Sequence, residues 1–264
     1  MSQRTLLFAF LLALLAPPPA RAQILQLPHP DSTAGNFFGV SVSIDGNRAL
    51  VGASAEDSCG TNSGAAYVFE RADSTDTWEM VARLQASDCE AGDFFGRSLA
   101  LSGDRALVAS AETFFNAAAS NAAYIFERDP ATGIWRQTAR LTADIGVQEG
   151  AFATSVDLDG DRALITTSGD PSNGRYGGAA YVFDYDPRTR TWLRSARLTA
   201  SRGVEYGVFG GNGVLDGDRI AVAASTYFEE KPCSVYVFER GSDGKWSETD
   251  RISSVTDFFI SIDL

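Results

Sequence analysis

The sequence predicts an all-β protein, a β-propeller built from four-stranded antiparallel blades. The first observation is a repeat, because a Phe, a Tyr and a Trp each return three more times at intervals of 54 to 57 residues. The repeated residues are Phe38, Phe95, Phe152 and Phe209; Tyr67, Tyr124, Tyr181 and Tyr236; and Trp78, Trp135, Trp192 and Trp246. A fixed period of this size is typical of propellers, solenoids and arrays. The second observation is a two-residue alternation of apolar and polar side chains within each copy, which indicates strands.

Each copy reads as four strands joined by turns. In the first copy, valine and isoleucine alternate with serine from Val40 to Ile44, as expected of a strand with two different faces. Asp45-Gly46 then predicts a tight hairpin turn, because glycine permits a positive φ. Residues 49–53 and 66–69 read as the second and third strands. In the fourth strand we expect one face to carry Trp78, Met80, Ala82 and Leu84.

The repeats give the domain organisation. We expect a signal peptide over residues 1–22 and a propeller domain over 23–264. The repeats are expected at about 31–85, 86–142, 143–199 and 200–253, with a partial fifth at 254–264. Gln23 to Leu27 resembles a fourth strand without its own blade, as in propellers that close the ring with an N-terminal strand. We therefore expect an incomplete propeller, a truncated relative of a longer one, whose open edges invite self-association.

The first residues read as a secretory signal. Arg4 is followed by an apolar run from Leu6 to Ala16 and by small residues at Ala20 and Ala22. The run is too short to cross a bilayer, which needs about 20 residues. Cleavage after Ala22 would leave 242 residues, located outside the cytoplasm as a secreted, periplasmic or cell-surface protein.

The charge of the chain restricts its partners. The net charge of −12 becomes −14 once the two arginines of the predicted signal are removed. An acidic surface repels phosphate backbones and anionic lipids, so nucleic acid and membrane partners are not expected. Later segments are not apolar enough to span a membrane.

The three cysteines allow one disulfide. Cys59 and Cys89 lie in consecutive loops at the same end of a blade, where they could pair in an oxidising compartment. Three unpaired thiols are the alternative.

Short phrases within the repeats carry a family resemblance. Phe38-Gly39, Phe95-Gly96 and Phe209-Gly210, with Val51-Gly52-Ala53, resemble the FG-GAP repeat of the integrin α-chain propeller. The later phrases Gly-Asp-Arg-Ala-Leu-Val and Ala-Ala-Tyr-Val-Phe-Glu-Arg are closer still to the FG-GAP variant of secreted bacterial proteins. The resemblance covers nearly all of the mature chain and implies a seven-bladed ring. Ala153 departs from the Phe-Gly pattern, and kelch repeats are a weaker match, since only Gly177-Gly178 fits them.

Metal sites and cofactors are not expected. In integrin repeats a long turn binds calcium, whereas here the turn is two residues long and cannot supply six to eight oxygen ligands. Asp157 to Asp161 resembles the start of an EF-hand loop, but its Gly comes too early and the sister copies lack Asp157. Asp170 to Gly174 is a weaker candidate, more simply explained as a turn-rich loop.

The sequence also argues against catalysis. The only histidine is His29, between two prolines, which removes triads that use histidine as the base and removes His-rich metal centres. Acidic residues are too numerous for spacing alone to single out a catalytic pair. We therefore predict that the protein is not an enzyme.

Residues found in only one copy are the better candidates for ligand binding, because a unique site does not need four copies. The copies differ most between the second and third strands, and these loops share one end of the propeller. Their aromatic residues are the tentative ligand contacts: Phe114, Phe115, Tyr176, Tyr227 and Phe228. Aromatics among carboxylates suit a glycan, a cationic peptide or a protein partner. The alternative is that the aromatics fold inward as loop plugs.

These observations together predict an exported recognition or adhesion module that acts through its variable loops on a protein or glycan ligand. The first alternative is a lectin-like sugar-binding propeller, or the propeller part of a polysaccharide-active enzyme. The second is a truncated structural relic without a ligand.

Overall fold

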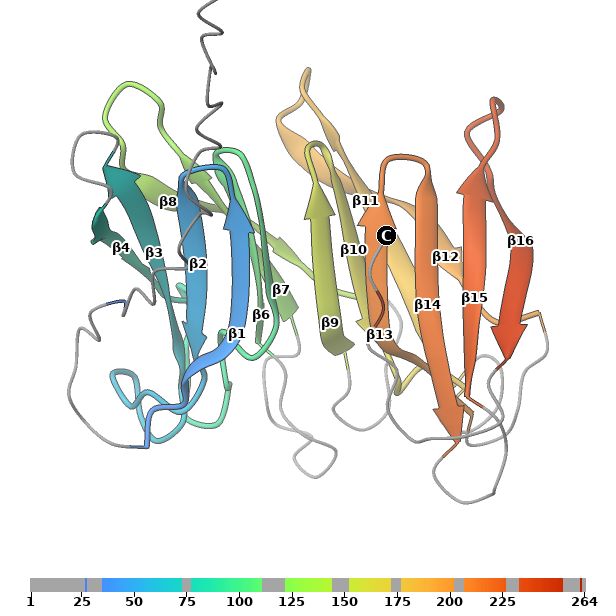
Figure 1. Cartoon of the computed structure of the whole chain (residues 1–264), viewed down its shortest axis with the longest axis horizontal. Helices are drawn as coiled ribbons and strands as arrows, with labels where there is room; N and C mark the ends of the chain where they lie inside the picture. Colours follow the sequence, from blue (N-terminus) through green and yellow to red (C-terminus); the bar gives the residue numbers. More distant parts are fainter. Residues whose placement is uncertain are drawn as a thin grey trace, which may run out of the picture.

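The predicted all-β class and four-stranded antiparallel blades are confirmed by a computed structural model of the chain. The structure describes residues 27, 35–72, 77–110, 122–143, 152–171, 177–201, 207–226, 233–253 and 262. Sixteen strands in these ranges form four separate antiparallel sheets (Figure 1). The predicted signal peptide, most of Gln23 to Leu27 and most of the partial fifth repeat lie outside the described residues.

Each sheet is one copy of the repeat, with its strands in chain order. Blade 1 comprises β1 (Phe38–Asp45), β2 (Arg48–Ala53), β3 (Ala65–Ala72) and β4 (Thr77–Leu84). Blade 2 comprises β5 (Leu99–Ser102), β6 (Arg105–Ser110), β7 (Ala122–Arg128) and β8 (Trp135–Leu141). Blade 3 comprises β9 (Phe152–Asp159), β10 (Arg162–Thr167), β11 (Ala179–Asp186) and β12 (Thr191–Leu198). Blade 4 comprises β13 (Gly207–Asp216), β14 (Arg219–Thr226), β15 (Ser234–Arg240) and β16 (Trp246–Ser253).

The blades have two distinct ends. The hairpin turns β1–β2 and β9–β10 lie at the upper end in Figure 1, which we call the turn end. The connection from β2 to β3 and the connection from β4 to β5, which joins blade 1 to blade 2, lie at the opposite end, which we call the loop end. The four described blades follow one another in chain order. Their first strands β1, β5, β9 and β13 contact one another in succession.

The first hairpin of every blade has the predicted tight turn. In blade 1, Asp45 pairs with Arg48 across it. Gly46 has φ 58°, and the equivalent glycines of the other blades have φ between 54° and 57°. This left-handed conformation favours glycine, which explains why glycine occupies the position in all four copies.

The predicted side-chain alternation of the fourth strand is wrong in one respect. Val68 pairs with Ala82, but the next residue, Phe69, pairs with Met80, so Val81 is an extra residue in a β-bulge. A register shift occurs at the same place in the other three blades. The bulge leaves Met80 and Val81 exposed, whereas Leu84 is buried.

A hydrophobic seam joins each pair of neighbouring blades. Between blades 1 and 2, Leu50 and Val68 lie on the side of blade 1 that packs against the next blade, which we call the back face of a blade. They pack with Leu99 and Leu101 on the opposite side of the sheet in blade 2, which we call the front face. Equivalent clusters join blade 2 to blade 3 and blade 3 to blade 4. A fourth cluster lies on the front face of blade 1, and Leu27 packs against it. The propeller core is therefore a series of contacts between blades.

The glycine of the Phe-Gly pair also has a structural reason. Gly96 has φ 90°, and a side chain there would meet the carbonyl of Ala65 in the preceding blade. Ala153, at the same position in blade 3, keeps this left-handed conformation with φ 63°. The departure at Ala153 therefore does not change the path of the blade, although an alanine in this region is strained.

Candidate functional site

At the turn end, a network of hydrogen bonds and ion pairs joins neighbouring blades. In each of blades 1 to 3, the arginine that begins the second strand donates from its Nε to a carboxylate of the same blade. The three pairs, each at 2.8 Å, are Arg48 with Glu70, Arg105 with Glu127 and Arg162 with Asp184. The same arginine also donates from Nη1 to a glycine carbonyl in the next blade. The acceptors are Gly103 at 3.0 Å, Gly160 at 3.0 Å and Gly217 at 2.5 Å.

A second bond crosses each seam in the reverse sense. The residue that ends the first strand accepts from the glycine N–H of the next hairpin. Gly103 donates to Asp45 at 2.6 Å, and Gly217 donates to Asp159 at 2.8 Å. Ser102 accepts from Gly160 at 3.0 Å. Every hairpin glycine at a seam therefore has both its N–H and its C=O bound to the preceding blade.

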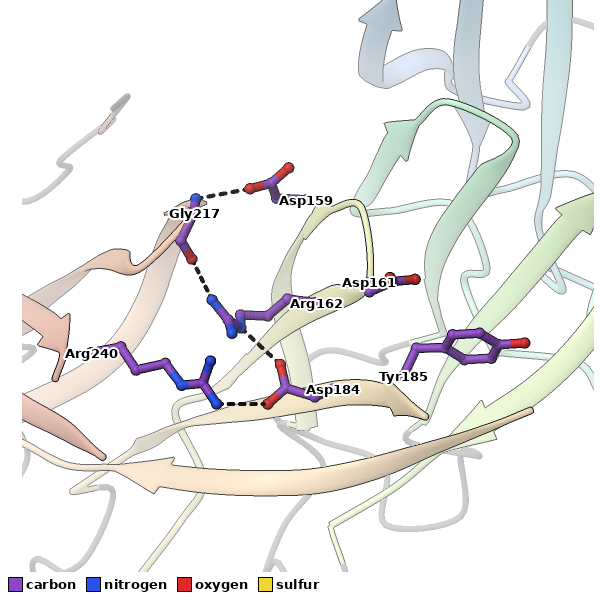
Figure 2. Close-up of a pocket in the computed structure, with 7 residues that line it drawn as sticks. All are labelled: Asp159, Asp161, Arg162, Asp184, Tyr185, Gly217 and Arg240. Carbon is purple, nitrogen blue, oxygen red and sulfur yellow. Dashed lines mark hydrogen bonds and ion pairs between the residues drawn. The ribbon is translucent and has the colours of Figure 1, made fainter. Parts of the chain in front are cut away.

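A shallow pocket of about 400 Å³ lies at the turn end between blades 3 and 4 (Figure 2). It is lined by Asp159, Asp161, Arg162, Asp184, Tyr185, Gly217 and Arg240. Figure 2 shows Arg162 bound to Gly217 and Asp184, and Asp159 bound to Gly217. These side chains are committed to the seam, so the pocket is a poor candidate for a ligand site.

The contact that lines this pocket differs from its equivalent at the seam of blades 1 and 2 in one residue and one distance. At the seam of blades 1 and 2, Arg128 lies 3.1 Å from Glu70. At the seam of blades 3 and 4 the carboxylate is Asp184, one methylene shorter, and Arg240 lies 3.9 Å from it. The pocket therefore lies at a contact between an arginine and a carboxylate that recurs between blades, and at this seam the two groups lie farther apart.

The acidic stretch that resembles a calcium loop also belongs to a seam. Asp157 accepts from the backbone N–H of Leu215 at 2.7 Å, and Asp159 accepts from Gly217. In the first blade, Ser43 accepts from Leu101 in the same way at 3.1 Å. Asp157 therefore takes the place of the Ser43 hydroxyl, and Asp159 takes the place of the Asp45 carboxylate. Among the residues that the structure describes, no group of three or more His, Cys, Asp or Glu is arranged to hold a metal ion.

At the loop end, the connections of blade 1 are cross-linked. Cys59 and Cys89 form a disulfide with their Cα atoms 6.1 Å apart, joining the β2–β3 loop to the connection between blades 1 and 2. In the same region, Arg83 lies 2.6 Å from Glu56, a buried carboxylate. Glu90 is exposed beside the disulfide. This part of the loop end is held in place by the protein itself and presents an acidic surface.

A buried acidic side chain organises the loop end of blade 3. Asp170 is fully buried and accepts from the hydroxyl of Tyr181 at 2.5 Å. Arg197 donates to both oxygens of this carboxylate, from Nε at 2.9 Å and from Nη2 at 2.5 Å. A bidentate arginine compensates the burial of the carboxylate. Asp170, one of the weak calcium candidates, therefore anchors the β10–β11 loop to β12.

Tyr181 is expected to titrate far above an ordinary tyrosine. Burial is the main cause and the hydrogen bond to Asp170 the next, and together they raise the pKa of Tyr181 to about 12 from 10.0. Because the unfolded chain loses this proton first, the stability that the neutral phenol contributes is complete below pH 10. It is lost as the pH rises toward about 12. Ultraviolet titration of the folded protein should show a late phenol that is absent in Tyr181→Phe, and an unchanged curve would contradict this assignment.

The ligand residues predicted from the sequence all lie outside the described residues. These are Phe114, Phe115, Tyr176, Tyr227 and Phe228. The sequence did not single out Arg197, although the Arg of the Ala-Arg-Leu phrase recurs as Arg83, Arg140 and Arg197.

Comparison with protein families gives one match. A family described as FG-GAP repeat matches residues 23–69, 78–126 and 135–183, which is more than half of the chain. None of the curated proteins compared with the chain matches it. In the part of the chain that the structure describes, no helix is long and apolar enough to cross a membrane.

Two solved structures show a similar fold. The first is a provisionally assigned 6-phosphogluconolactonase from Bacteroides uniformis, with a TM-score of 0.53 and 16% identity over 81% of this chain and 54% of that one. The second is the periplasmic gluconolactonase PpgL of Pseudomonas aeruginosa, with a TM-score of 0.53 and 14% identity over 84% of this chain and 59% of that one. The chain therefore spans less than two thirds of the length of either structure.

These structures correct one prediction. The prediction that the protein is not an enzyme is overturned, because both similar structures are named as lactonases and the architecture is therefore one that carries catalysis. A single histidine in the sequence argues only against catalytic mechanisms that need histidine. At this level of identity the likeness shows the fold alone, and it assigns no substrate to this chain.

Proposed function

Because the chain belongs to the FG-GAP repeat family, we propose that it is an exported recognition or adhesion module that binds its ligand at the loop end. The observation that carries the proposal is the difference between the two ends of the blades. At the turn end the same arginine, carboxylate and glycine recur at every seam and bind each other. At the loop end the copies differ in length and composition. Residues engaged in repeated internal contacts have little freedom to bind a ligand, so specificity resides at the loop end.

The loop end also has the form that a binding site needs. The disulfide between Cys59 and Cys89 holds two connections together, and Asp170 with Arg197 holds a third. Loops fixed in this way lose little conformational entropy on binding. Phe114, Phe115, Tyr176, Tyr227 and Phe228 remain the proposed contacts, because aromatic side chains dominate the energetics of binding surfaces.

The charge of the chain favours a basic partner. The net charge is −12, and the exposed Glu90 lies beside the cross-linked loops. An acidic surface raises the rate at which a cationic segment finds it. We propose a basic segment of a protein as the ligand. A location outside the cytoplasm agrees with the disulfide and with the periplasmic gluconolactonase of similar fold.

A charge reversal at Glu90 should weaken binding of a basic peptide. Removing one attractive charge and adding one repulsive charge is expected to weaken the affinity for an oligolysine peptide about fivefold at low salt. Glu79→Lys is the matched control, because Glu79 is also exposed but lies on β4, away from the cross-linked loops. Calorimetric titration of both variants measures the difference. Equal effects of the two variants would indicate only non-specific attraction to an acidic protein.

A sugar or sugar-lactone ligand is the second candidate. Two solved structures of similar fold are named as lactonases, and the aromatic residues of the loops suit a sugar face. Binding to immobilised glycans or hydrolysis of gluconolactone that is lost in Tyr176→Ala and Tyr227→Ala would favour it. If glycan binding and lactone hydrolysis are unchanged in both variants, these loops are not the sugar site. If the protein binds none of the ligands tested, a structural role without a ligand is the better interpretation.

A further inference from the structure

The two ends of the blade series carry open halves of the seam. On the front face of blade 1, Val42 and Ile44 are 70% and 67% exposed. Leu99 and Leu101, at the same repeat positions in blade 2, are at most 7% exposed, because blade 1 covers them. Leu27 packs on the aromatic cluster of this face but leaves Val42 and Ile44 uncovered. The inner half of the front face therefore resembles the faces that a neighbouring blade covers at the three seams, and among the described residues none covers it.

The back face of blade 4 shows the reciprocal situation. Ile252 is 60% exposed, whereas the equivalent Leu84, Leu141 and Leu198 are at most 6% exposed. The seam arginine of blade 4, Arg219, has a side chain that is 66% exposed, against 15% for Arg162. Arg219 keeps the bond to the carboxylate of its own blade, Glu239, at 3.2 Å.

We propose that the front face of blade 1 in one copy of the chain docks on the back face of blade 4 in a second copy, reproducing the internal seam between molecules. Three seams within the chain already join these two kinds of face, so the contact continues an established interface. Arg219 would donate to the carbonyl of Gly46 in the second copy, as Arg162 does to Gly217. Asp216 would accept from the N–H of Gly46, as Asp159 does from Gly217.

The chemistry of the two faces agrees with this pairing. The outermost faces offer Val42 and Ile44 on one side and Val237 and Ile252 on the other, all aliphatic. Ile252 would take the position that Leu27 holds on the front face, so Leu27 must give way there. The contact uses sheet faces, in contrast to the edge-mediated association expected from the sequence.

The number of described blades is compatible with a closed pair. The structure describes four blades in each copy. Two copies of the four described blades would give eight, within the usual range of four to eight. Each copy would then supply one front face and one back face, and both interfaces would be identical.

Sedimentation velocity of the secreted chain over a range of concentrations tests the proposal. We expect a dimer that dissociates on dilution, and at least tenfold weaker association for both Ile44→Asp and Arg219→Asp. Leu193→Asp is the control, because Leu193 is 56% exposed on β12 away from either face and should leave association unchanged. Since all three side chains are exposed in the single copy, thermal unfolding should confirm that the variants fold.

Mixing the two variants distinguishes this arrangement from others. An Ile44→Asp copy paired with an Arg219→Asp copy has one interface with both changes and one without either, so the mixture should associate more tightly than each variant alone. A protein that stays monomeric at about 100 μM would overturn the proposal. It would also be overturned if only one variant mattered, or if mixing gave no recovery.

Discussion

Shortening Leu141 to alanine is expected to lower the free energy of unfolding by about 3 kcal/mol, whereas the same change at Ile252 lowers it by less than about 1 kcal/mol. The two residues occupy the same position in their repeats, at the end of the fourth strand. Leu141 is 4% exposed and lies in the cluster between blades 2 and 3, so its truncation leaves a cavity. Ile252 faces outward on blade 4.

Urea unfolding of the two variants, each compared with the unmodified chain at low protein concentration, measures this difference. Low concentration matters because the proposed pairing of copies would bury Ile252. Similar losses for both variants would mean that blade 4 is covered in the isolated chain, contrary to the structure.

Removing the disulfide is expected to produce the other large effect. The double variant Cys59→Ser/Cys89→Ser should lose about 3 kcal/mol of stability, because the cross-link closes a loop with a sequence separation of 30 in the unfolded chain. Thermal unfolding with and without a reductant measures the change. The reductant should destabilise the unmodified chain to the level of the variant and leave the variant unaffected.

A stable reduced protein would contradict this expectation. It would show that the loop end of blade 1 is fixed by contacts such as Arg83 with Glu56 rather than by the cross-link. Cys233 is buried and takes no part in this disulfide.

The fold could be predicted because the repeat states the same structure four times. Four copies of the Phe, Tyr and Trp fix the blade, and Gly46 with its equivalents fixes the first turn. The bulge at Val81 could not be predicted, because an extra residue in one strand appears only when its pairing with β3 is known. Arg48 recurs at the same position of every copy, but the sequence does not show that it bonds to the next blade, as Arg48 does to Gly103.

Less of the candidate site could be predicted. Residues shared by all copies were set aside as ligand contacts. At the turn end this agrees with the structure, because Arg162 bonds to Asp184 and Gly217 within the protein. The anchoring of the β10–β11 loop by Asp170 and Arg197 depends on side chains brought together across a sheet, which spacing alone does not reveal. The enzyme prediction failed because a fold accommodates more chemistries than the one that a missing residue type excludes.

The most direct test of the different roles of the two ends is hydrogen exchange of the chain with and without a bound oligolysine peptide. The peptide should slow exchange in the cross-linked connections, over residues 54–64 and 85–98, where the loop end of blade 1 is described. The hairpins 102–105, 159–162 and 216–219 should be unchanged, because the N–H of the glycine in each hairpin is already bound across a seam. Protection of these hairpins with no change at the loop end would contradict the account.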